Sequence, residues 1–224
     1  MKILAEHSIT SWLTPTLKLP EIKLFSFKKG VHPAYDAFDL SNPDVFVCKA
    51  SAIDSAMVKN ITERPHLKVV IVDDSAEDCD KLKSTLGDCF VKMPNLNYCD
   101  LDGCLKAEKS PQLKTEVVCV EASLFPESPN WNFKSAKIFS SVSSINHKFF
   151  CGVLPPEMKF TAYASAKYSI VPESEFYNVL MCGSIPVKDD RLEPQSSLTK
   201  EEILKSFTNV RFCEQLLTSL GEKQ

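Results

Sequence analysis

Glycine is scarce in this chain, with only six among 224 residues. The GxGxxG fingerprint, in which glycines let the backbone approach a pyrophosphate, is absent, and this removes the usual sequence basis for a dehydrogenase. The chain also lacks the P-loop of nucleotide triphosphatases, the HExxH motif of zinc proteases and the GxSxG motif of α/β-hydrolases. If the protein is an enzyme, its site does not depend on these motifs.

Long apolar runs and closely spaced cysteines are missing as well. No segment approaches the ~20 apolar residues of a membrane-spanning helix. The opening residues MKILAEHSITSW are too polar for the apolar core of a signal peptide. We therefore expect a cytoplasmic protein without a membrane span. The nine cysteines include no CxxC pair, which favours reduced thiols and predicts no metal site.

The composition is that of an ordinary globular protein, with 44% hydrophobic and 25% charged residues. The net charge of −3 argues against a dedicated nucleic-acid-binding protein. A chain of 224 residues is long enough for one large domain or two small ones. The sequence carries no signal for an oligomeric state.

Short apolar segments alternate with helical patterns along the first ninety-seven residues. We expect strands at 2–5, 22–27, 45–48, 67–72 and 89–91, with helical segments at 35–40, 51–63 and 76–86. This alternation is typical of a parallel sheet and predicts an N-terminal Rossmann-like domain over residues 1–97. Residues 98–115 are predicted to be an irregular linker region. A second Rossmann-like domain is predicted over 116–224, ending in an amphipathic helix at 210–220 that is expected to pack back across the domain junction.

The clearest pattern lies between residues 149 and 187. Strands are predicted at 149–151, 168–171 and 185–187, and helices at 157–167 and 175–182. In the second helix Ser174 is the expected N-cap and Gly183 the expected left-handed residue after the C-terminus. Glu175 and Asn178 then share a side near the helix start, at the sheet edge where ligands bind. Amides there suit a phosphate, and these side chains suit sugar hydroxyls.

The segment YASAKYSIVPES…NVLMCGSIPV, preceded by FxGxLPPE with Cys151 as x, resembles the C-terminal, nucleotide-sugar-binding half of GT-B-fold glycosyltransferases. The resemblance implies two Rossmann-like domains facing across a cleft. It also implies a nucleotide-diphospho-sugar donor, such as a UDP-sugar, and no required metal. In that family one acidic residue lies near the donor sugar, and Glu173 or Glu175 can take this role. Asn178 stands where the family has a second glutamate, and the loop between the two is shorter.

The donor-binding residues follow from this resemblance and from their positions along the segment. Helix amides and a lysine or arginine can stabilise the departing diphosphate without a metal. Lys159 is a further candidate for that cation. The predicted donor-binding set is Lys167, Glu173, Ser174, Glu175, Asn178, Lys188 and Arg191.

Catalytic candidates come from the ends of the first domain's strands. A general base needs a pKa near the working pH and reach to the acceptor hydroxyl. His7 directly follows the first strand, and histidine titrates in this range. Asp73 and Asp74 follow the strand at 67–72, and Asp36 lies near the same edge. The alternatives are a solvated loop for His7, and helix capping and solvation for Asp73 and Asp74.

The resemblance implies transfer of a sugar to an acceptor hydroxyl bound by the first domain. The acceptor is a saccharide or polymer, or a hydroxymethylated DNA base as in compact phage glycosyltransferases of this fold. The alternative is a non-catalytic nucleotide- or sugar-binding module with a degenerate glycosyltransferase fold. The departures at Asn178 and in the shortened loop favour that alternative.

Overall fold

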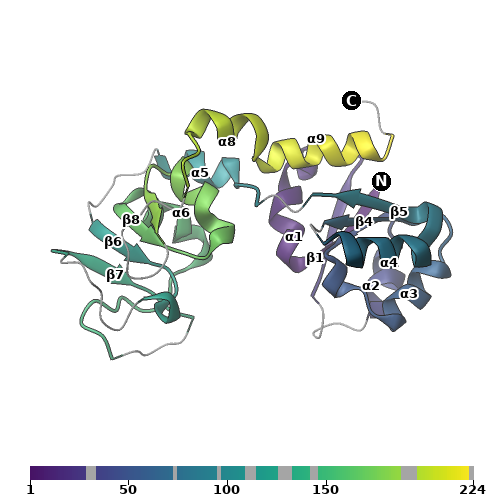
Figure 1. The fold of residues 1–224 in the computed structure, drawn as a ribbon, viewed down its shortest axis with the longest axis horizontal. Helices are drawn as coiled ribbons and strands as arrows, with labels where there is room; N and C mark the ends of the chain where they lie inside the picture. Colours follow the sequence, from purple (N-terminus) through teal and green to yellow (C-terminus); the bar gives the residue numbers. More distant parts are fainter. Residues whose placement is uncertain are drawn as a thin grey trace. The chain divides into compact units, whose positions relative to one another are not determined.

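The two sheets formed by the described residues are parallel, with helices in the connections between strands (Figure 1). The computed structural model describes residues 1–28, 34–72, 75–94, 97–108, 115–125, 133–141, 146–187 and 196–221. In this part of the chain one sheet has five strands, ordered β2-β1-β3-β4-β5, and the other has four, ordered β7-β6-β8-β9. The predicted α/β fold class with parallel sheets is confirmed.

Each sheet forms the centre of one of two compact units. Unit 1 consists of Met1–Leu96 together with Asn209–Gln224, and unit 2 of Asn97–Thr208. The division after Leu96 lies beside the predicted end of the first domain. The last helix, which is expected to pack back across the domain junction, groups with unit 1.

The strands of unit 1 are β1 (Lys2–Glu6), β2 (Lys23–Phe27), β3 (Val45–Cys48), β4 (Lys68–Val72) and β5 (Phe90–Met93). The intervening helices are α1 (His7–Thr10), η1 (Ser11–Lys18), α2 (Ala34–Ser41), η2 (Ala50–Ala52), α3 (Ser55–Thr62), α4 (Ala76–Leu86) and η3 (Gly87–Cys89), the η elements being 3-10 helices. All four residues of β3 are buried, as expected for a parallel strand covered on both faces. Helices α2, α3 and α4 pack on one face through a core that contains Phe38, Met57 and Cys79.

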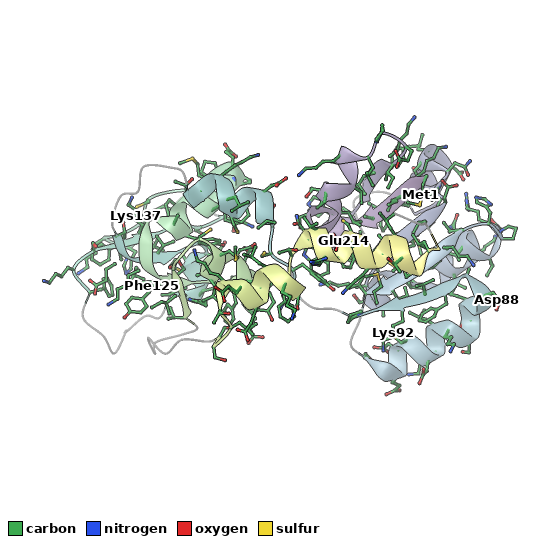
Figure 2. The ribbon with its side chains drawn as sticks, turned by 90° about the horizontal axis from the view of Figure 1, so that it is seen from above. Met1, Asp88, Lys92, Phe125, Lys137 and Glu214 are labelled. Atoms are coloured by element: carbon green, nitrogen blue, oxygen red, sulfur yellow. The ribbon has the colours of Figure 1, made fainter. Side chains whose placement is uncertain are left out.

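The C-terminal helix α9 (Asn209–Ser219) completes unit 1 by packing on η1; Glu214 marks it in Figure 2. The Phe212 ring meets Trp12 edge-on, with 5.5 Å between the ring centroids. Cys213 Sγ donates a hydrogen bond to the Trp12 carbonyl at 3.2 Å. The amphipathic helix predicted at 210–220 is therefore confirmed, and its apolar side covers η1.

The strands of unit 2 are β6 (Thr115–Cys119), β7 (Ala136–Ile138), β8 (Ala166–Ile170) and β9 (Ile185–Val187). Its helices are α5 (Leu101–Glu108), η4 (Ala122–Leu124), η5 (Pro156–Met158), α6 (Lys159–Ala164), η6 (Glu173–Glu175), α7 (Phe176–Met181) and α8 (Lys200–Ser206). One core joins α5, α6, α7 and α8. A second core is formed by buried residues of all four strands, and the rings of Phe125, Phe133 and Phe149 pack against it.

The sequence misplaced several boundaries in unit 2. Helix α5 lies within the predicted linker 98–115, and Cys104 and Ala107 on it are buried. Instead of a strand at 149–151 there is one isolated bridge, between Ile138 and Phe150. The predicted helix at 157–167 ends at Ala164, because β8 already begins at Ala166.

Among the described residues, no helix combines the length and apolarity needed to cross a membrane.

Helices α5 and α6 approach closely at Gly103. A Cβ atom added to Gly103 would overlap the ring of Phe160. Alanine normally stabilises a helix interior by about 1 kcal/mol relative to glycine. Forcing atoms into a packed core costs about 1–3 kcal/mol. We therefore expect Gly103→Ala to lower the free energy of unfolding despite its better helix propensity, as measured by urea denaturation.

A double-mutant cycle tests the cause of that loss. Phe160→Leu removes part of the ring, so the Gly103→Ala substitution should cost less in the Phe160→Leu background than in the wild type. Equal costs in both backgrounds would contradict a clash with Phe160.

All nine cysteines lie in the described residues, and none forms a disulfide bond. Cys151 is exposed, Cys89 is half-buried, and the others are buried. Burial raises the pKa of Cys99, Cys119 and Cys213 to about 12. Such thiols react slowly because the thiolate is the reactive form.

Thiol titration should therefore separate Cys151 from the other cysteines. In the native protein we expect one fast-reacting thiol, which is lost in Cys151→Ser. After denaturation without reductant, all nine cysteines should titrate. A fast native phase that persists in Cys151→Ser, or fewer than nine thiols after denaturation, would contradict this prediction.

Candidate functional site

The site lies where the chain leaves β6 and β8 toward opposite edges of the unit 2 sheet. Strand β6 leads to β7 on one side, whereas β8 leads through α7 to β9 on the other. In open parallel sheets, ligands bind beyond the carboxyl ends of two strands that diverge in this way. The strand order therefore indicates a binding position at this point.

A pocket of about 410 Å³ lies at this position. Its volume falls in the range of small-molecule sites, about 300–1,000 Å³. Apolar side chains form most of the wall, and a few polar groups converge on it. The lining residues are Val120, Glu121, Leu124, Leu154, Pro156, Lys159, Tyr163, Pro172 and Glu175.

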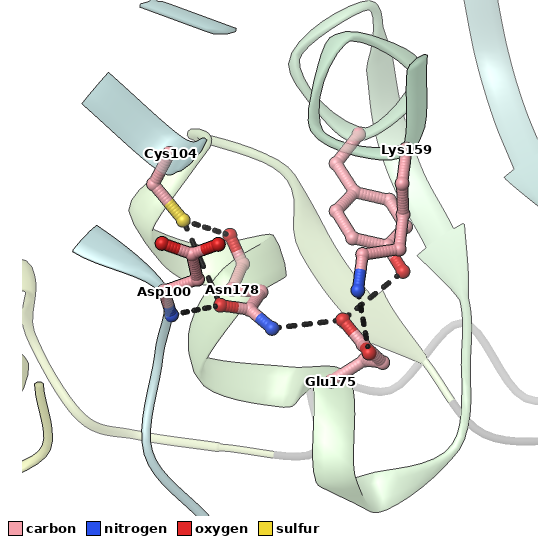
Figure 3. A network of polar contacts seen from close by, with 6 residues as sticks. Asp100, Cys104, Lys159, Glu175 and Asn178 are labelled. Carbon is pink, nitrogen blue, oxygen red and sulfur yellow. Dashed lines mark hydrogen bonds and ion pairs between the residues drawn. The ribbon is translucent and has the colours of Figure 1, made fainter. Parts of the chain in front are cut away.

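The Glu175 carboxylate is the centre of a polar network beside the pocket (Figure 3). Lys159 Nζ lies 2.9 Å from Oε1. The Tyr163 hydroxyl donates to Oε2 at 3.3 Å, and Asn178 Nδ2 donates to the same oxygen at 2.8 Å. Burial and the nearby Glu175 charge raise the pKa of Tyr163, so this hydroxyl stays a donor. These contacts join α6 and α7 through one carboxylate.

Asn178 extends the network to the start of α5. Its Oδ1 accepts a hydrogen bond from the backbone amide of Asp100 at 2.8 Å. The backbone N–H of Asp100 can only donate, so it must face the oxygen of the Asn178 side chain. The Glu175 carboxylate can only accept, so it must face the Asn178 nitrogen. Both contacts therefore require the same orientation of the Asn178 side-chain amide. Asn178 is 6% exposed and does not line the pocket. It therefore acts on the pocket through Glu175.

A second carboxylate, that of Glu121, lines the pocket just beyond the end of β6. It accepts hydrogen bonds from the Ser140 hydroxyl at 2.9 Å and the Ser141 amide at 3.1 Å. Partial desolvation acts to raise the pKa of Glu121, but these hydrogen bonds outweigh it and lower the pKa below the usual value. Glu121 thus stays ionised and can act as a hydrogen-bond acceptor on the pocket wall.

The chemistry of the pocket follows from this arrangement. Two carboxylates can accept hydrogen bonds from a sugar, and the apolar wall can pack against an aromatic base. Lys159 brings a positive charge to the same wall, although its amine is paired with Glu175. In the described residues there is no group of three or more His, Cys, Asp or Glu side chains suited to hold a metal.

The predicted donor-binding residues fall into separate places. Glu175 lines the pocket, and Asn178 lies behind it. Glu173 and Ser174 are exposed on η6, and Glu175 rather than Ser174 occupies the N-cap position of α7. Gly183 has the predicted left-handed conformation, with φ of 85°.

The remaining donor candidates are distant from the pocket or lie outside the described residues. Lys167 is at the amino end of β8, the opposite end of the strand from the pocket, and its amine lies over the Tyr168 ring. Its place is a poor fit to donor binding. Lys188 and Arg191 lie outside the described residues.

The catalytic candidates belong to unit 1. His7 opens α1 directly after β1, and its Nδ1 lies 3.2 Å from Ser26 Oγ. Asp36 is half-buried in the first turn of α2, which follows β2. Both are therefore at the carboxyl edge of the unit 1 sheet. Asp73 and Asp74 lie outside the described residues.

Three contributors to the site were not singled out by the sequence: Glu121, Tyr163 and Asp100. Glu121 carries a usable signal, because it follows a buried strand as Asp73 follows β4. Tyr163 and Asp100 carry none, because their roles depend on how α5, α6 and α7 pack together.

A larger pocket, of about 520 Å³, lies in unit 1 beside α9, with Met1 and Glu214 among its lining residues (Figure 2). Met1 and Ile22, which also line it, directly precede β1 and the start of β2. This pocket is therefore at the amino ends of the strands, opposite to the edge where ligands bind in such sheets.

No model of a protein family matches this chain, and no curated protein matches its sequence. The interpretation of the site therefore depends on its own geometry and chemistry.

Asn178→Asp tests the role of Asn178 in the network. The new carboxylate would keep the contact with Asp100 but place its other oxygen against Glu175 Oε2. Burial and the like charge would raise its folded pKa above the unfolded value of about 3.9. Stability is then retained below the unfolded pKa and lost as pH rises through the folded one. We expect a loss of about 2–4 kcal/mol near pH 8 and a smaller loss near pH 5.

Asn178→Ala is the matched control, because it removes the same contacts without adding a charge. Its loss in urea unfolding should change little over this pH range. A pH-independent loss in Asn178→Asp would contradict the arrangement of the two side chains.

Proposed function

We propose that this protein is a glycosyltransferase, which moves a sugar from a nucleotide-diphospho-sugar to an acceptor hydroxyl. The observation that carries this proposal is the pocket at the ends of β6 and β8, with Glu121, Lys159 and Glu175 on its wall. The segment that resembles the donor-binding half of GT-B glycosyltransferases forms α6, β8, α7 and β9, and it supplies Lys159, Tyr163 and Glu175 to the wall of that pocket. Sequence resemblance and pocket position thus support the same ligand class.

The polar groups of the pocket suit a nucleotide sugar in distinct ways. Carboxylates accept hydrogen bonds from ribose or sugar hydroxyls, and the apolar wall suits a nucleobase. Lys159 is the cation of the lining residues and would approach a phosphate oxygen. We propose a UDP-sugar as the donor.

The acceptor would bind to unit 1 in a GT-B-like arrangement, with His7 or Asp36 taking the proton of its hydroxyl. A saccharide or polymer hydroxyl suits this scheme, and so does a hydroxymethylated DNA base. The net charge of −3 favours a saccharide over DNA.

A non-catalytic nucleotide- or sugar-binding module is the second candidate. The observation that favours it is the pairing of Lys159 with Glu175, which partly neutralises a charge that would otherwise stabilise a departing diphosphate. The two candidates differ in turnover, because a pure binding module releases the nucleotide sugar intact.

Thermal unfolding with nucleotides tests the binding step. A ligand at a hundred times its dissociation constant stabilises a fold by about 2.7 kcal/mol. We expect a higher Tm with a nucleoside diphosphate such as UDP than with the matching nucleoside. Lys159→Met should reduce the difference between the two, because it removes the cation near the phosphates.

Lys167→Met is the control, since it removes a lysine at the opposite end of β8 and should leave the shift unchanged. No shift with any common nucleoside diphosphate would overturn the proposal, and so would an equal loss in Lys167→Met. Mass spectrometry of the incubated nucleotide sugar then separates transfer or hydrolysis from binding alone.

A further inference from the structure

A chain of hydrogen bonds leads from His7 back to the end of β1. Nδ1 of His7 lies 3.2 Å from Ser26 Oγ, which lies 3.1 Å from Thr10 Oγ1. Thr10 Oγ1 lies 3.2 Å from the Glu6 carbonyl oxygen. The parallel register places Ser26 opposite Ala5, beside the point where β1 passes into α1. The sheet pairing and the first helical turn therefore bring these groups together.

The direction of the hydrogen bonds follows from counting protons. A carbonyl oxygen can only accept, so the Thr10 hydroxyl donates to Glu6. Thr10 has then used its one hydrogen, and Ser26 must donate in the contact between the two hydroxyls. The Ser26 oxygen is left to accept, and the hydrogen between Ser26 and His7 belongs to Nδ1.

We propose that Thr10 and Ser26 hold neutral His7 in the tautomer with hydrogen on Nδ1, leaving the Nε2 lone pair as a proton acceptor. Histidine is directed in this way when a partner of one ring nitrogen fixes the state of the other. Thr10 and Ser26 are positioning residues in this scheme. They act on chemistry only through the imidazole.

This inference gives the proposed function a specific base, and its catalytic consequence rests on that function. Nε2 would take the hydrogen of the acceptor hydroxyl while the acceptor oxygen bonds to the sugar carbon. The bond from that carbon to the phosphate oxygen would break, and its electron pair would leave on the diphosphate. No oxidant or metal is needed to balance this step.

The tautomer is measured by nitrogen-15 NMR of the histidine side chains, at an alkaline pH where they are neutral. In the wild type, Nδ1 of His7 should resonate as a protonated nitrogen and Nε2 as a bare one. Thr10→Val keeps the side-chain shape but removes the acceptor of the Ser26 hydrogen. Ser26 can then donate to Nδ1, so the two nitrogen shifts should move toward the opposite pattern.

Thr10→Ser keeps the hydroxyl and should keep the wild-type pattern, and Ser26→Ala should give a mixture of tautomers. The other three histidines serve as internal references. A wild-type His7 with its hydrogen on Nε2, or unchanged shifts in both Thr10→Val and Ser26→Ala, would overturn the inference whether or not sugar transfer is observed.

Activity supplies the second measurement. His7→Ala should lower turnover by about 10²–10⁴-fold without changing donor affinity. Thr10→Val should lower it by about 10-fold or more, because the wrong tautomer cannot accept the proton. Thr10→Ser keeps the hydroxyl and should keep the wild-type turnover. Wild-type turnover in Thr10→Val would refute the catalytic consequence, whereas donor binding without any turnover would refute the proposed function and leave the NMR result standing.

Discussion

The Glu175 carboxylate holds together the helices that surround the unit 2 pocket. It receives hydrogen bonds from Lys159 and Tyr163 on α6 and from Asn178 on α7, and its side chain is 21% exposed. Removing a carboxylate from water is costly unless several donors replace the lost hydration. Three donors do so here, and Asn178 passes the constraint to α5 through the Asp100 amide. The network that positions Glu175 in the pocket is therefore also part of the packing of three helices.

The general architecture could be predicted because it depends on local patterns. Buried apolar segments of four to six residues, separated by helical periodicity, are sufficient to indicate parallel β-α units. Helix α5 was missed because Gly103 lies within it and argues against a helix on propensity alone. Its stabilisation comes from Asp100, which caps the Gly103 amide, and from packing against α6. Neither contribution is visible in sequence periodicity.

The candidate site shows the same limit at the level of single residues. The spacing of Glu175 and Asn178 correctly placed them side by side. It could not show that Asn178 also accepts a hydrogen bond from the Asp100 amide, because that contact joins residues 78 apart in the chain. Lys167 belongs to the same motif, but the direction of β8 puts it at the amino end of the strand, away from the pocket. A residue's place in a motif therefore has less predictive value than its position relative to the carboxyl end of a strand.

The two units share a strand order but differ in how a carboxylate near the end of the first strand is used. In unit 1, Glu6 at the end of β1 accepts a hydrogen bond from the Lys49 amide at 2.9 Å and so spans the ends of β1 and β3. In unit 2, Glu121 turns toward Ser140 and Ser141 beyond β7, and the pocket lies between the ends of β6 and β8. At the ends of the two diverging strands, unit 1 therefore has a hydrogen bond, whereas unit 2 has a pocket at the same position. This difference favours ligand binding in unit 2 and leaves unit 1 to present side chains such as His7 beside β2.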